Sequence, residues 1–419
     1  MRYCARCLYP ANHPLNIVIG DDGICSGCRV HEEKDVLDWT ERRQKLASIL
    51  DQYRSRTGRT FDCIVPVTGG RDSHFIVDTI KREFGMNPLL VSYNQHYNTA
   101  LGIRNLSYLR TQTDCDFVQF MVGVDNVKRI TRATVRLMGS IYWHILAGLT
   151  VFPVQTAVRF KIPLIIWGFH QGMEQVGMFS HLDEVEMTRK YRKDHDLMGW
   201  EAEDLLADPT LSEGDVEPWI YPHNRELEKV GVRGIYLDNY IRWDSKAQHE
   251  AMIRAYGYET LDQARTFDRY MNVDCYHYSG LHDHIKYLKW GYGRAADHAS
   301  REVRLRRMTR RQGIAQATKY AEAPARDARV FLEWIGWKAG ALFEEIDRFR
   351  DPRIWRRDGT RWTLLDSVAN HADDPNAEAA ALPLRESNGA DFVLTPPRQP
   401  NSIEYRHRIL ARGWADRWY

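Results

Sequence analysis

Two groups of residues in this chain have the types and spacing that chemistry requires, and the first is a short glycine loop. Residues 66–74 read Pro-Val-Thr-Gly-Gly-Arg-Asp-Ser-His and follow the apolar run at residues 63–65. This order predicts a buried strand, a glycine turn and the start of a helix. The glycines let the backbone turn its N–H groups inward, and the helix adds its positive N-terminus. The loop therefore predicts a cradle for an anion, with phosphate as the natural occupant.

The second group is a set of two cysteine pairs near the start of the chain. Cys4 and Cys7 form one C-x2-C pair, and Cys25 and Cys28 form the other. Their spacing is typical of a structural zinc ribbon, because each pair brings two thiolates to the same ion. Four thiolates leave no open coordination position, which indicates a structural and not a catalytic metal. The alternative is four free thiols that share this spacing by chance.

Composition and charge limit the classes of protein. The chain has 58 basic and 56 acidic residues among 419, which does not favour a nucleic acid or a membrane surface as a partner. No stretch approaches 18 consecutive apolar residues, and the first residues lack an apolar leader. We therefore expect no membrane insertion and a cytoplasmic location, where paired cysteines bind metal and do not form disulfides.

Strand and helix patterns alternate along the first half of the chain. Apolar strands are expected at residues 62–67, 87–93, 116–122 and 163–167, and helices at residues 38–57, 72–84, 100–113, 124–138 and 141–160. This alternation predicts an α/β fold with a doubly wound parallel sheet. Ligands bind at the carboxyl ends of the strands in such sheets. We expect the glycine loop, residues 92–94 and residues 168–170 to meet there over one nucleotide.

Four regions follow from these patterns. They are a zinc ribbon at residues 1–37, a nucleotide domain at 38–235, a helical region at 236–369 that closes over substrate, and a linker and tail at 370–419. Residues 171–235 are polar and irregular, which is typical of a lid or substrate loop. Residues 370–403 are rich in Ala, Asp and Pro and predict a linker or an extended arm.

The glycine loop resembles the S-G-G-x-D-S loop of the ATP pyrophosphatases, the PP-loop enzymes with an adenine-nucleotide alpha-hydrolase-like fold. It is not the Walker-type loop, because no lysine follows the second glycine. The resemblance implies cleavage of ATP to AMP and pyrophosphate, with Mg²⁺ on the phosphate oxygens. It assigns the nucleotide to Thr68, Gly69, Gly70, Arg71, Asp72 and Ser73, together with Ser92, Tyr93, Asn94 and Gly168.

Two positions depart from the PP-loop pattern, and the loop as a whole also admits a simpler interpretation. Thr68 replaces a serine but keeps the hydroxyl, whereas His74 replaces a Ser or Thr and puts one phosphate contact in doubt. The simpler alternative is an ordinary strand-to-helix turn in which Asp72 or Ser73 caps the helix.

Several further segments extend the resemblance to a family. The stretches WIYPHNREL, GIYLDNYIRWD, HDHIKYLKWGYGRAADH and RLRRMTR, in this order after the ribbon and the loop, resemble the N-acetyl sugar amidotransferases of bacterial surface-polysaccharide synthesis. The resemblance covers about residues 1–365. It implies that ATP adenylates an acetamido oxygen of a sugar, with UDP as the expected carrier, and that ammonia then displaces AMP. Because no glutaminase pattern is visible, it also implies a separate glutaminase subunit as the ammonia source.

Catalytic residues are assigned with this resemblance in mind. Asp72 is expected on the magnesium or pyrophosphate side. The family carries an acid directly after the glycine that ends the fourth strand, but Phe169 stands there, so Glu174 is taken as the substitute. Lys286, Lys289 or Arg294 is expected to reach the ATP phosphates. The alternatives are a solvated loop charge for Glu174 and a wetted helix face for the lysines.

Three further assignments stay open between a functional and a structural role. The run from Arg301 to Arg311 holds six arginines that could bind a diphosphate or carboxylate, or form a solvated helix face. Asp244 could contact substrate or cap the next helix. His96 and Asn105 could touch adenosine or substrate.

Two other functions compete with the amidotransferase. A tRNA-thiolating enzyme of the same superfamily would also adenylate a carbonyl, but it needs extra cysteines, and only Cys63, Cys115 and Cys275 remain outside the pairs. A non-enzymatic zinc-ribbon protein that binds nucleic acid or protein is the second alternative. It does not explain a phosphate cradle at a strand end.

Overall fold

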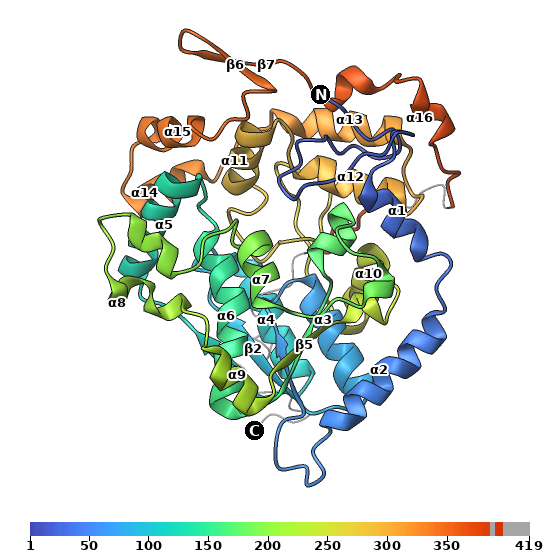
Figure 1. The fold of residues 1–419 in the computed structure, drawn as a ribbon, viewed down its shortest axis with the longest axis vertical. Coiled ribbons are helices and arrows are strands. Elements are labelled where there is room, and N and C mark those ends of the chain that lie inside the picture. Colours follow the sequence, from blue (N-terminus) through green and yellow to red (C-terminus); the bar gives the residue numbers. More distant parts are fainter. Residues whose placement is uncertain (386–389, 397–419) are drawn as a thin grey trace.

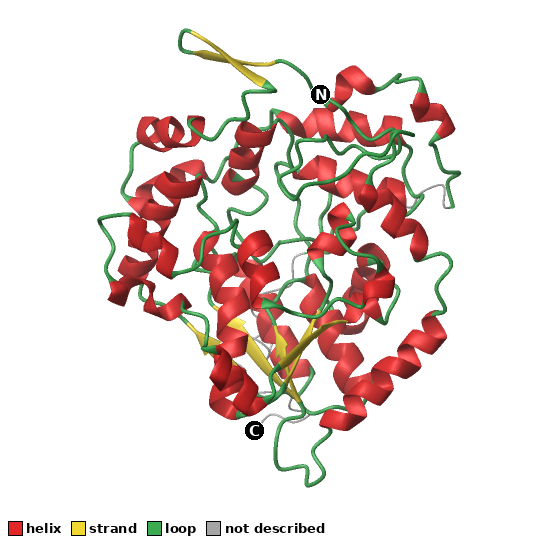
Figure 2. Cartoon of the chain, viewed as in Figure 1, coloured by secondary structure: helices red, strands yellow, loops and turns green. Residues whose placement is uncertain are grey.

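A central sheet surrounded by helices forms one half of the molecule, and a helical layer that holds both the N-terminal and the later C-terminal segments forms the other (Figures 1 and 2). The computed structural model describes residues 1–385 and 390–396. The N-terminal segment lies beside α12 and α13 in the upper half of Figure 1, and the sheet lies below.

The sheet has five parallel strands. They are β1 (Cys63–Pro66), β2 (Pro88–Tyr93), β3 (Phe117–Phe120), β4 (Leu164–Trp167) and β5 (Arg233–Tyr236). Their order is β3-β2-β1-β4-β5, so the chain builds outward from β1 on one side and then from β4 on the other. The strand order therefore reverses between β1 and β4, and the loops after these two strands diverge and open a crevice.

Both faces of the sheet are buried, which explains the nearly continuous apolar sequence of the strands. Ile64, Leu89 and Ile165 belong to a core shared with α5 and α6. Val65 and Leu90, one position along their strands, belong to a second core shared with α2 and α3. Successive side chains point to opposite faces, so each strand contributes to two cores.

Helices cover the sheet and build the second layer. In chain order they are α1 (Ser26–Glu33), α2 (Trp39–Tyr53), α3 (Arg71–Asp78), α4 (Ala100–Gln112), α5 (Val124–Met138), α6 (Trp143–Phe160), α7 (Arg189–Tyr191), α8 (Glu213–Val216), α9 (Asn224–Val230), α10 (Ser245–Tyr256), α11 (Leu281–Trp290), α12 (Arg294–Arg304), α13 (Arg310–Ala321), α14 (Ala328–Ile335), α15 (Ala339–Asp347) and α16 (Asn376–Ala379). A hairpin of β6 (Trp355–Asp358) and β7 (Arg361–Leu364) projects from this layer (Figure 1).

Helix ends follow the local sequence. Asp38 accepts hydrogen bonds from Thr40 N and Glu41 N at the start of α2, and Asp244 accepts one from Ala247 N at the start of α10. Asp244 therefore has the capping role that the sequence allowed for it. Helix α5 ends at Gly139 in a left-handed conformation with φ of +63°, as expected for a glycine after a helix.

The expected α/β sheet is confirmed, but the prediction missed three elements. The fifth strand lies inside residues 171–235, which were expected to be irregular, because it is only four residues long and contains Arg233 and Gly234. The β6–β7 hairpin and the helix-free residues 257–280 lie inside the region expected to be helical. The conformation of these segments depends on turn propensity and on long-range contacts. Neither produces a periodic pattern that a single sequence reveals.

The described residues beyond 370 lie against the rest of the chain and do not form a free linker. Arg385 N donates to Arg306 O, and Thr395 N donates to the Thr260 hydroxyl at 2.8 Å. Phe392 is buried with its ring 4.9 Å from that of Tyr270. This part of the predicted arm is extended and packed, whereas residues 386–389 and 397–419 lie outside the described residues.

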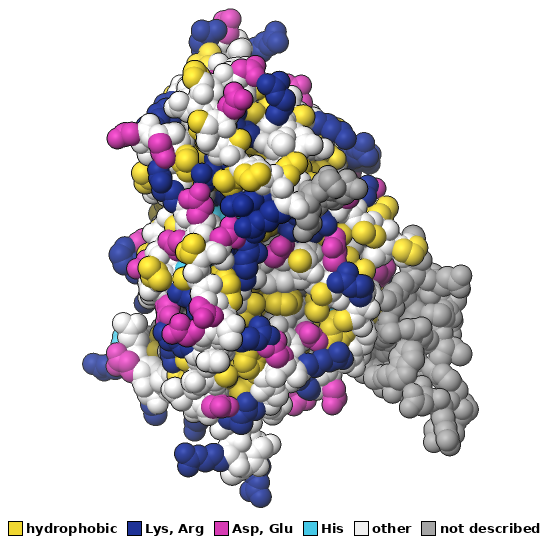
Figure 3. All heavy atoms as spheres, turned by 90° about the vertical axis from the view of Figure 1, so that its right-hand side faces the viewer, with side chains coloured by type: hydrophobic (Ala, Val, Ile, Leu, Met, Phe, Trp, Pro, Cys, Tyr) yellow, Lys and Arg dark blue, Asp and Glu magenta, His cyan; other side chains and the backbone are white. Residues whose placement is uncertain are grey.

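No single helix in the described residues is long and apolar enough to cross a membrane. The helices α5 and α6 pass such a test only as a pair, bent by 115°. Acidic and basic side chains are interspersed over the face shown in Figure 3, with a local gathering of Lys and Arg near its centre.

A fully buried ion pair holds the start of α12. Arg265 Nε lies 2.7 Å from Asp283 Oδ2, and both side chains are at most 1% exposed. The other oxygen of Asp283 accepts a hydrogen bond from Arg294 N, the first residue of α12. The pair therefore fixes the helix that carries the later arginines.

We expect Arg265→Met to lower the free energy of unfolding by about 3–5 kcal/mol, because Asp283 would stay buried without its cation. Urea denaturation followed by circular dichroism measures this change. The control is Arg329→Met, which removes an exposed pair with Glu333 and should change the free energy by less than about 0.5 kcal/mol. Equal effects of the two substitutions would contradict the structural importance of the buried pair.

Candidate functional site

A cavity of about 220 Å³ lies at the crevice, where the loops after β1 and β4 diverge. We call it the loop cavity. Most of its lining comes from three parts of the chain, the glycine loop, the segment after β4 and residues 271–304, and Tyr9, Trp243 and Ser245 complete it. Its lining residues are Tyr9, Thr68, Gly70, Asp72, Ser73, Phe169, Gln171, Glu174, Gln175, Trp243, Ser245, Met271, Asn272, Asp274, Tyr278, Arg294, Asp297, His298, Arg301 and Arg304.

The glycine loop has the conformation that the sequence predicts. Gly69 has φ of +84°, and a Cβ there would lie 2.7 Å from Leu106 Cβ, so a larger residue does not fit. Gly70 precedes α3 as its N-cap residue. Thr68 N donates to Ser73 Oγ at 3.0 Å, and Gly70 N donates to Thr68 Oγ1 at 3.1 Å. These two hydroxyls therefore hold the loop closed around the N-terminus of α3.

His74, which departs from the PP-loop pattern, does not line the loop cavity. Its ring is fully buried beneath the loop, with Nδ1 3.3 Å from Gly70 O and the ring of Tyr258 at 5.2 Å. Burial lowers the pKa of His74 to about 4, so the ring is uncharged at neutral pH. His74 packs under the loop instead of supplying the phosphate contact of the usual Ser or Thr.

Four carboxylates line the loop cavity, and two of them, Asp72 and Asp274, lie at the glycine loop, where the sequence pointed only to Asp72. Asp72 is the predicted acid of the loop. Asp274 lies beside Gly70 and accepts a hydrogen bond from Gln95 Nε2 at 3.0 Å. Burial raises the pKa of Asp274, and the nearby Asp72 adds to this effect. Two carboxylates beside a phosphate cradle are a donor set that suits Mg²⁺ together with phosphate oxygens.

Helix α12 lays one face along the loop cavity. Its residues Arg294, Asp297, His298, Arg301 and Arg304 line the wall at helical spacing. Arg301 is paired with Asp268 and Glu302 at 2.7 Å each. Arg307 is likewise buried between Asp244 and Glu302, whereas Arg311 is 78% exposed, so the run is not a uniformly solvated helix face.

In contrast to Arg301, Arg294 has no carboxylate within ion-pair distance among the described residues. Its Nη2 donates to Asn272 Oδ1 at 2.9 Å, and its guanidinium lies 3.7 Å from the ring centroid of Tyr278. Its buried Nε has no hydrogen-bond partner in the described structure. Arg294 therefore keeps donor capacity for an anion, and its expected contact with the ATP phosphates stays a prediction.

Glu174, the predicted substitute acid, lines the same cavity from the segment after β4. Its carboxylate is paired with Lys34, whose side chain is only 1% exposed. Lys34 comes from the turn that follows α1, so the N-terminal segment holds this acid in place. Phe169 lines the cavity beside it, at the position where the family carries an acid.

A second cavity of about 510 Å³ adjoins the first, and we call it the outer cavity. The two share Gln171, Gln175, Tyr278, Arg294 and Asp297 as lining residues. The outer cavity combines aromatic rings with polar groups: Tyr142, Trp200, Tyr278, Trp290 and Phe349 stand among His13, His195, His282, Lys286 and Lys289. Lys286 and Lys289, which were predicted on the ATP phosphates, line this cavity and not the loop cavity.

Other predicted residues lie away from both cavities. Ser92 and Tyr93 are buried in β2, where the Tyr93 ring packs against Gly148. Asn94 caps a neighbouring turn by accepting from His96 N and Asn98 Nδ2. Gly168 ends β4 under Ile76 and Trp243. Their proposed part in nucleotide binding stays a prediction, as does that of Arg71, whose side chain is outside the described part.

Asn105 and His96 also lie off the cavity walls. Asn105 is fully buried, where its Nδ2 donates to Glu259 O and its Oδ1 accepts from Glu259 N. His96 has φ of +62° and lies near His144 in the core. Asn105 therefore has a structural partner for both ends of its amide.

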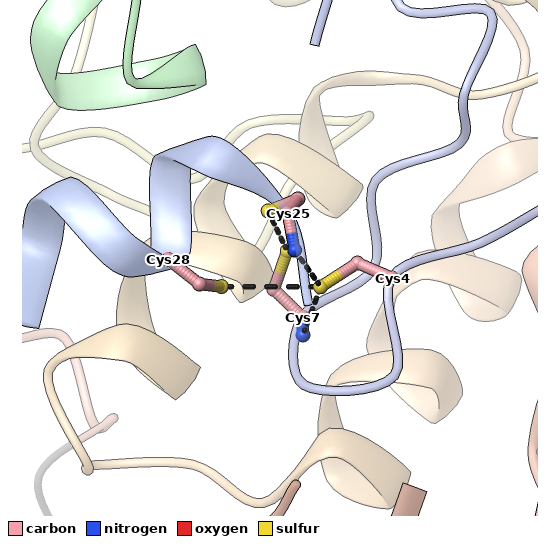
Figure 4. A group of neighbouring side chains, drawn as sticks. All are labelled: Cys4, Cys7, Cys25 and Cys28. Carbon is pink, nitrogen blue, oxygen red and sulfur yellow. Dashed lines mark hydrogen bonds between the residues drawn. The ribbon is translucent and has the colours of Figure 1, made fainter. Parts of the chain in front are cut away.

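The four cysteines of the two pairs converge on one point (Figure 4). Their sulfurs lie within 4.8 Å of one another, with Cys7 to Cys25 at 3.6 Å and Cys4 to Cys28 at 4.0 Å. A tetrahedron with Zn–S bonds of about 2.3 Å needs sulfurs about 3.8 Å apart. Cys7 N and Cys25 N point at the sulfur of Cys4, as backbone amides do around a bound thiolate. The donor set fits a single zinc ion.

The cysteine cluster adjoins the wall of the loop cavity. Arg304, which lines that cavity, donates from Nε to Cys28 Sγ at 3.4 Å and from Nη2 to Cys25 Sγ at 3.5 Å. Its Nη1 donates to the backbone oxygens of Glu174 and Gln175 at 3.1 and 2.8 Å. Ser26 Oγ donates to Val176 O beside them. The N-terminal segment that carries the four cysteines, together with Arg304, thus holds the turn at residues 172–177 that presents Glu174 and Gln175.

The residues that the sequence did not reveal share one property. Tyr9, Asp274, Asn272, Trp243 and Gln175 reach the loop cavity from segments that are far apart in the chain. Only Trp243 belongs to a local motif, the stretch GIYLDNYIRWD. The apolar and polar pattern of residues 268–280, rich in Tyr, Asp and Asn, is the only local signal that points to a loop with a function.

Removing the metal should loosen the turn at residues 172–177, because Arg304 and α1 lose the thiolates that anchor them. We expect Cys25→Ser to lower the metal content and to speed hydrogen exchange in the peptides that cover residues 25–34 and 172–177. Peptides of β1 and β2 should keep their exchange rates. Metal analysis and hydrogen-exchange mass spectrometry measure both effects.

A matched pair of variants distinguishes the anchoring effect of Arg304 from the effect of the metal. Arg304→Lys should keep the metal and still speed exchange at residues 172–177, since lysine cannot make the same fork of hydrogen bonds. Arg29→Lys, which alters only an exposed pair with Asp22, is the control. Unchanged exchange at residues 172–177 in both Cys25→Ser and Arg304→Lys would rule out this coupling.

Comparisons with known proteins add a likeness for one region. Residues 264–369 match the family described as LPS biosynthesis protein WbpG-like, C-terminal domain. This region spans α11 to α15 and the β6–β7 hairpin, and it supplies Met271, Asp274, Tyr278 and the α12 face to the two cavities. No curated protein matches the chain.

Two solved structures show limited likeness in fold. The NH3-dependent NAD synthetase from Campylobacter jejuni subsp. jejuni NCTC 11168, in complex with the nitrate ion, has a TM-score of 0.26 and 10% identity, over 44% of this chain and 80% of that one. The NMN synthetase from Francisella tularensis has a TM-score of 0.26 and 12% identity, over 52% of this chain and 93% of that one. The comparisons thus show that the helical region after residue 264 is similar to the C-terminal domain of WbpG-like LPS biosynthesis proteins.

Proposed function

We propose that this chain is an ATP-dependent amidotransferase that converts an acetamido group of a sugar, carried by a nucleotide such as UDP, into an acetamidino group. One observation carries the proposal: a phosphate-type glycine loop opens onto a cavity that adjoins a second cavity suited to a sugar. The region that matches the WbpG-like LPS biosynthesis domain lines both cavities, and lipopolysaccharide is built from sugars.

The outer cavity has the chemistry that sugar binding needs. Aromatic rings offer flat apolar faces to a sugar ring, and polar groups between them can pair with hydroxyls. His13, His195 and His282 each have one buried ring nitrogen with no partner in the described residues. Its volume of about 510 Å³ lies in the range of ordinary ligand sites.

The proposed reaction has two steps. The acetamido oxygen attacks the α-phosphorus of ATP, the bond to the β-phosphate oxygen breaks, and pyrophosphate leaves with its electron pair. Ammonia then adds to the imidate carbon, the carbon–oxygen bond breaks, and AMP leaves as the nitrogen gives up its excess proton. Adenylation is needed because an amide oxygen is a poor leaving group.

The residues of this chain have positioning and electrostatic tasks in that reaction. The loop from Thr68 to Ser73 holds the phosphates at the N-terminus of α3. Asp72 and Asp274 would hold Mg²⁺, which neutralises charge on the phosphate oxygens. Arg294, between the two cavities, stabilises the phosphate under attack. Glu174 is placed to accept a proton from the incoming ammonia once a substrate displaces part of its contact with Lys34.

Three further parts belong to the same proposal. A separate glutaminase subunit supplies ammonia, zinc occupies the four-cysteine cluster as a structural ion, and the reaction takes place in the cytoplasm. The near balance of 58 basic and 56 acidic residues supports a small-molecule substrate more than a nucleic acid.

An assay with ammonia tests the function directly. The purified chain is incubated with ATP, Mg²⁺, an ammonium salt and a panel of UDP-linked acetamido sugars. We expect AMP only when the correct sugar is present, with a product whose mass shows oxygen replaced by NH. AMP formation that depends on tRNA and a sulfur donor would instead support thiolation, and salt-sensitive RNA binding without AMP would support a binding protein.

Asp72→Asn should slow pyrophosphate release by about 100-fold or more, because the loop would lose the carboxylate that faces the phosphates. Release is measured with the coupled pyrophosphate assay under the same conditions. The control is Asp78→Asn on the same helix, outside both cavities. Near-normal release by the Asp72 variant would remove the loop from the reaction.

A further inference from the structure

We propose that the outer cavity contains an anion subsite, built on Lys289 and reached by Arg294, that holds the negatively charged phosphate or carboxylate group of the acceptor. This inference rests on the proposed function, because it assigns the charged end of the acceptor to a place. It moves Lys289 away from ATP, where the sequence predicted it.

The charges of the outer cavity leave Lys289 without a counter-ion. Each acid on the wall has its own partner: Asp194 pairs with Lys190, Asp196 with His195 and Asp297 with Lys286. Lys289 Nζ donates at 2.8 Å to the backbone oxygen of Met138. No carboxylate lies within 4 Å of it among the described residues. An ammonium group has three donors, so at least one remains for a ligand.

The surroundings of Lys289 favour an anion over water. The ammonium lies 5.3 Å from the ring centroid of Phe349, and Trp290 follows it on the cavity wall. Burial lowers the pKa of Lys289 to about 8, which shows that the free site holds its cation at a cost. A bound anion would raise the pKa of Lys289 again, because it stabilises the charged ammonium. Lysine is a regular ligand for phosphate in such settings.

The position of Lys289 also fits a site that holds two substrates, ATP at the glycine loop and the acceptor in the outer cavity. It precedes Arg294 by five residues, across the turn between α11 and α12, and both line the outer cavity. Arg294 alone of the two lines the loop cavity as well. An acceptor whose charged group lies on Lys289 would extend toward Arg294 and present its far end to the glycine loop. The subsite therefore sets the direction in which the acceptor enters.

Binding measured without ATP tests the subsite separately from turnover. Isothermal titration calorimetry compares the wild-type chain with Lys289→Met, using four probes: N-acetylglucosamine, its 1-phosphate, UDP-N-acetylglucosamine and an N-acetylated aminouronic acid. For each charged probe that binds the wild-type chain, we expect Lys289→Met to lower the affinity by about tenfold or more. The affinity for the uncharged sugar should stay unchanged. A loss confined to the phosphate probes identifies phosphate, and a loss confined to the uronic acid identifies carboxylate.

Two controls keep the test specific. Lys229→Met removes an exposed lysine of α9, outside both cavities, and should change no affinity. Lys289→Arg keeps a cation and should keep most of the affinity for the charged probes. Equal affinities of wild type and Lys289→Met for every charged probe would overturn the proposal. If Lys289-dependent binding is found without any AMP formation, the subsite stands and the proposed reaction fails.

The pH dependence gives an independent reading. A lysine binds an anion only when charged, so affinity is present below the pKa and falls as the pH rises through about 8. Lys289→Arg should show no such fall up to pH 9.5, since arginine stays charged. The other ionisable groups on the wall are His13, Tyr142, Asp194, His195, Asp196, Tyr278, His282, Lys286, Arg294 and Asp297. A fall that persists in Lys289→Arg would assign the titration to one of these and contradict the subsite.

Discussion

The reversal of strand order between β1 and β4 is the constraint on which the other features of the site depend. It separates the loops that follow these two strands, and the space between them is the loop cavity. Glycine is required on one side, because α4 approaches Gly69 too closely for any side chain. On the other side, the turn at residues 172–177 must be held by another part of the chain. The crevice is thus a consequence of topology, and its chemistry comes from segments that pack over it.

Those segments come from both ends of the sequence. The N-terminal segment supplies Lys34 and the cysteine sulfurs that hold Arg304, and α12 supplies the face that closes the cavity. Buried charges are matched one by one: Arg301 with Asp268 and Glu302, and Arg265 with Asp283. Arg294 and Lys289 are exceptions within the described structure. In a wall where most charges are paired, cations without a carboxylate are the places where an anionic ligand gains most.

The sequence predicted the first four strands to within a few residues, because strands buried on both faces are short apolar runs between polar turns. It also predicted the cysteine cluster and the glycine loop, whose residues are close in the chain. It missed β5, which has four residues with a glycine and an arginine, and the β6–β7 hairpin. Asp274 was missed as well, since its partner Gln95 is 179 residues away and no local pattern marks the pair.

The contact between Arg304 and Cys28 joins residues 276 positions apart, and this separation affects how the chain folds during synthesis. The cysteine pairs leave the ribosome early and can close on a metal ion through local contacts alone. Helix α12, which packs against this segment in the finished protein, is synthesised about 14 to 55 seconds later at ordinary rates of synthesis. During that interval Leu8 and Tyr9 lack the residues of α12 and α13 that belong to the same buried cluster in the finished protein. Early metal binding would keep this exposed segment in its folded form until its partner helix arrives.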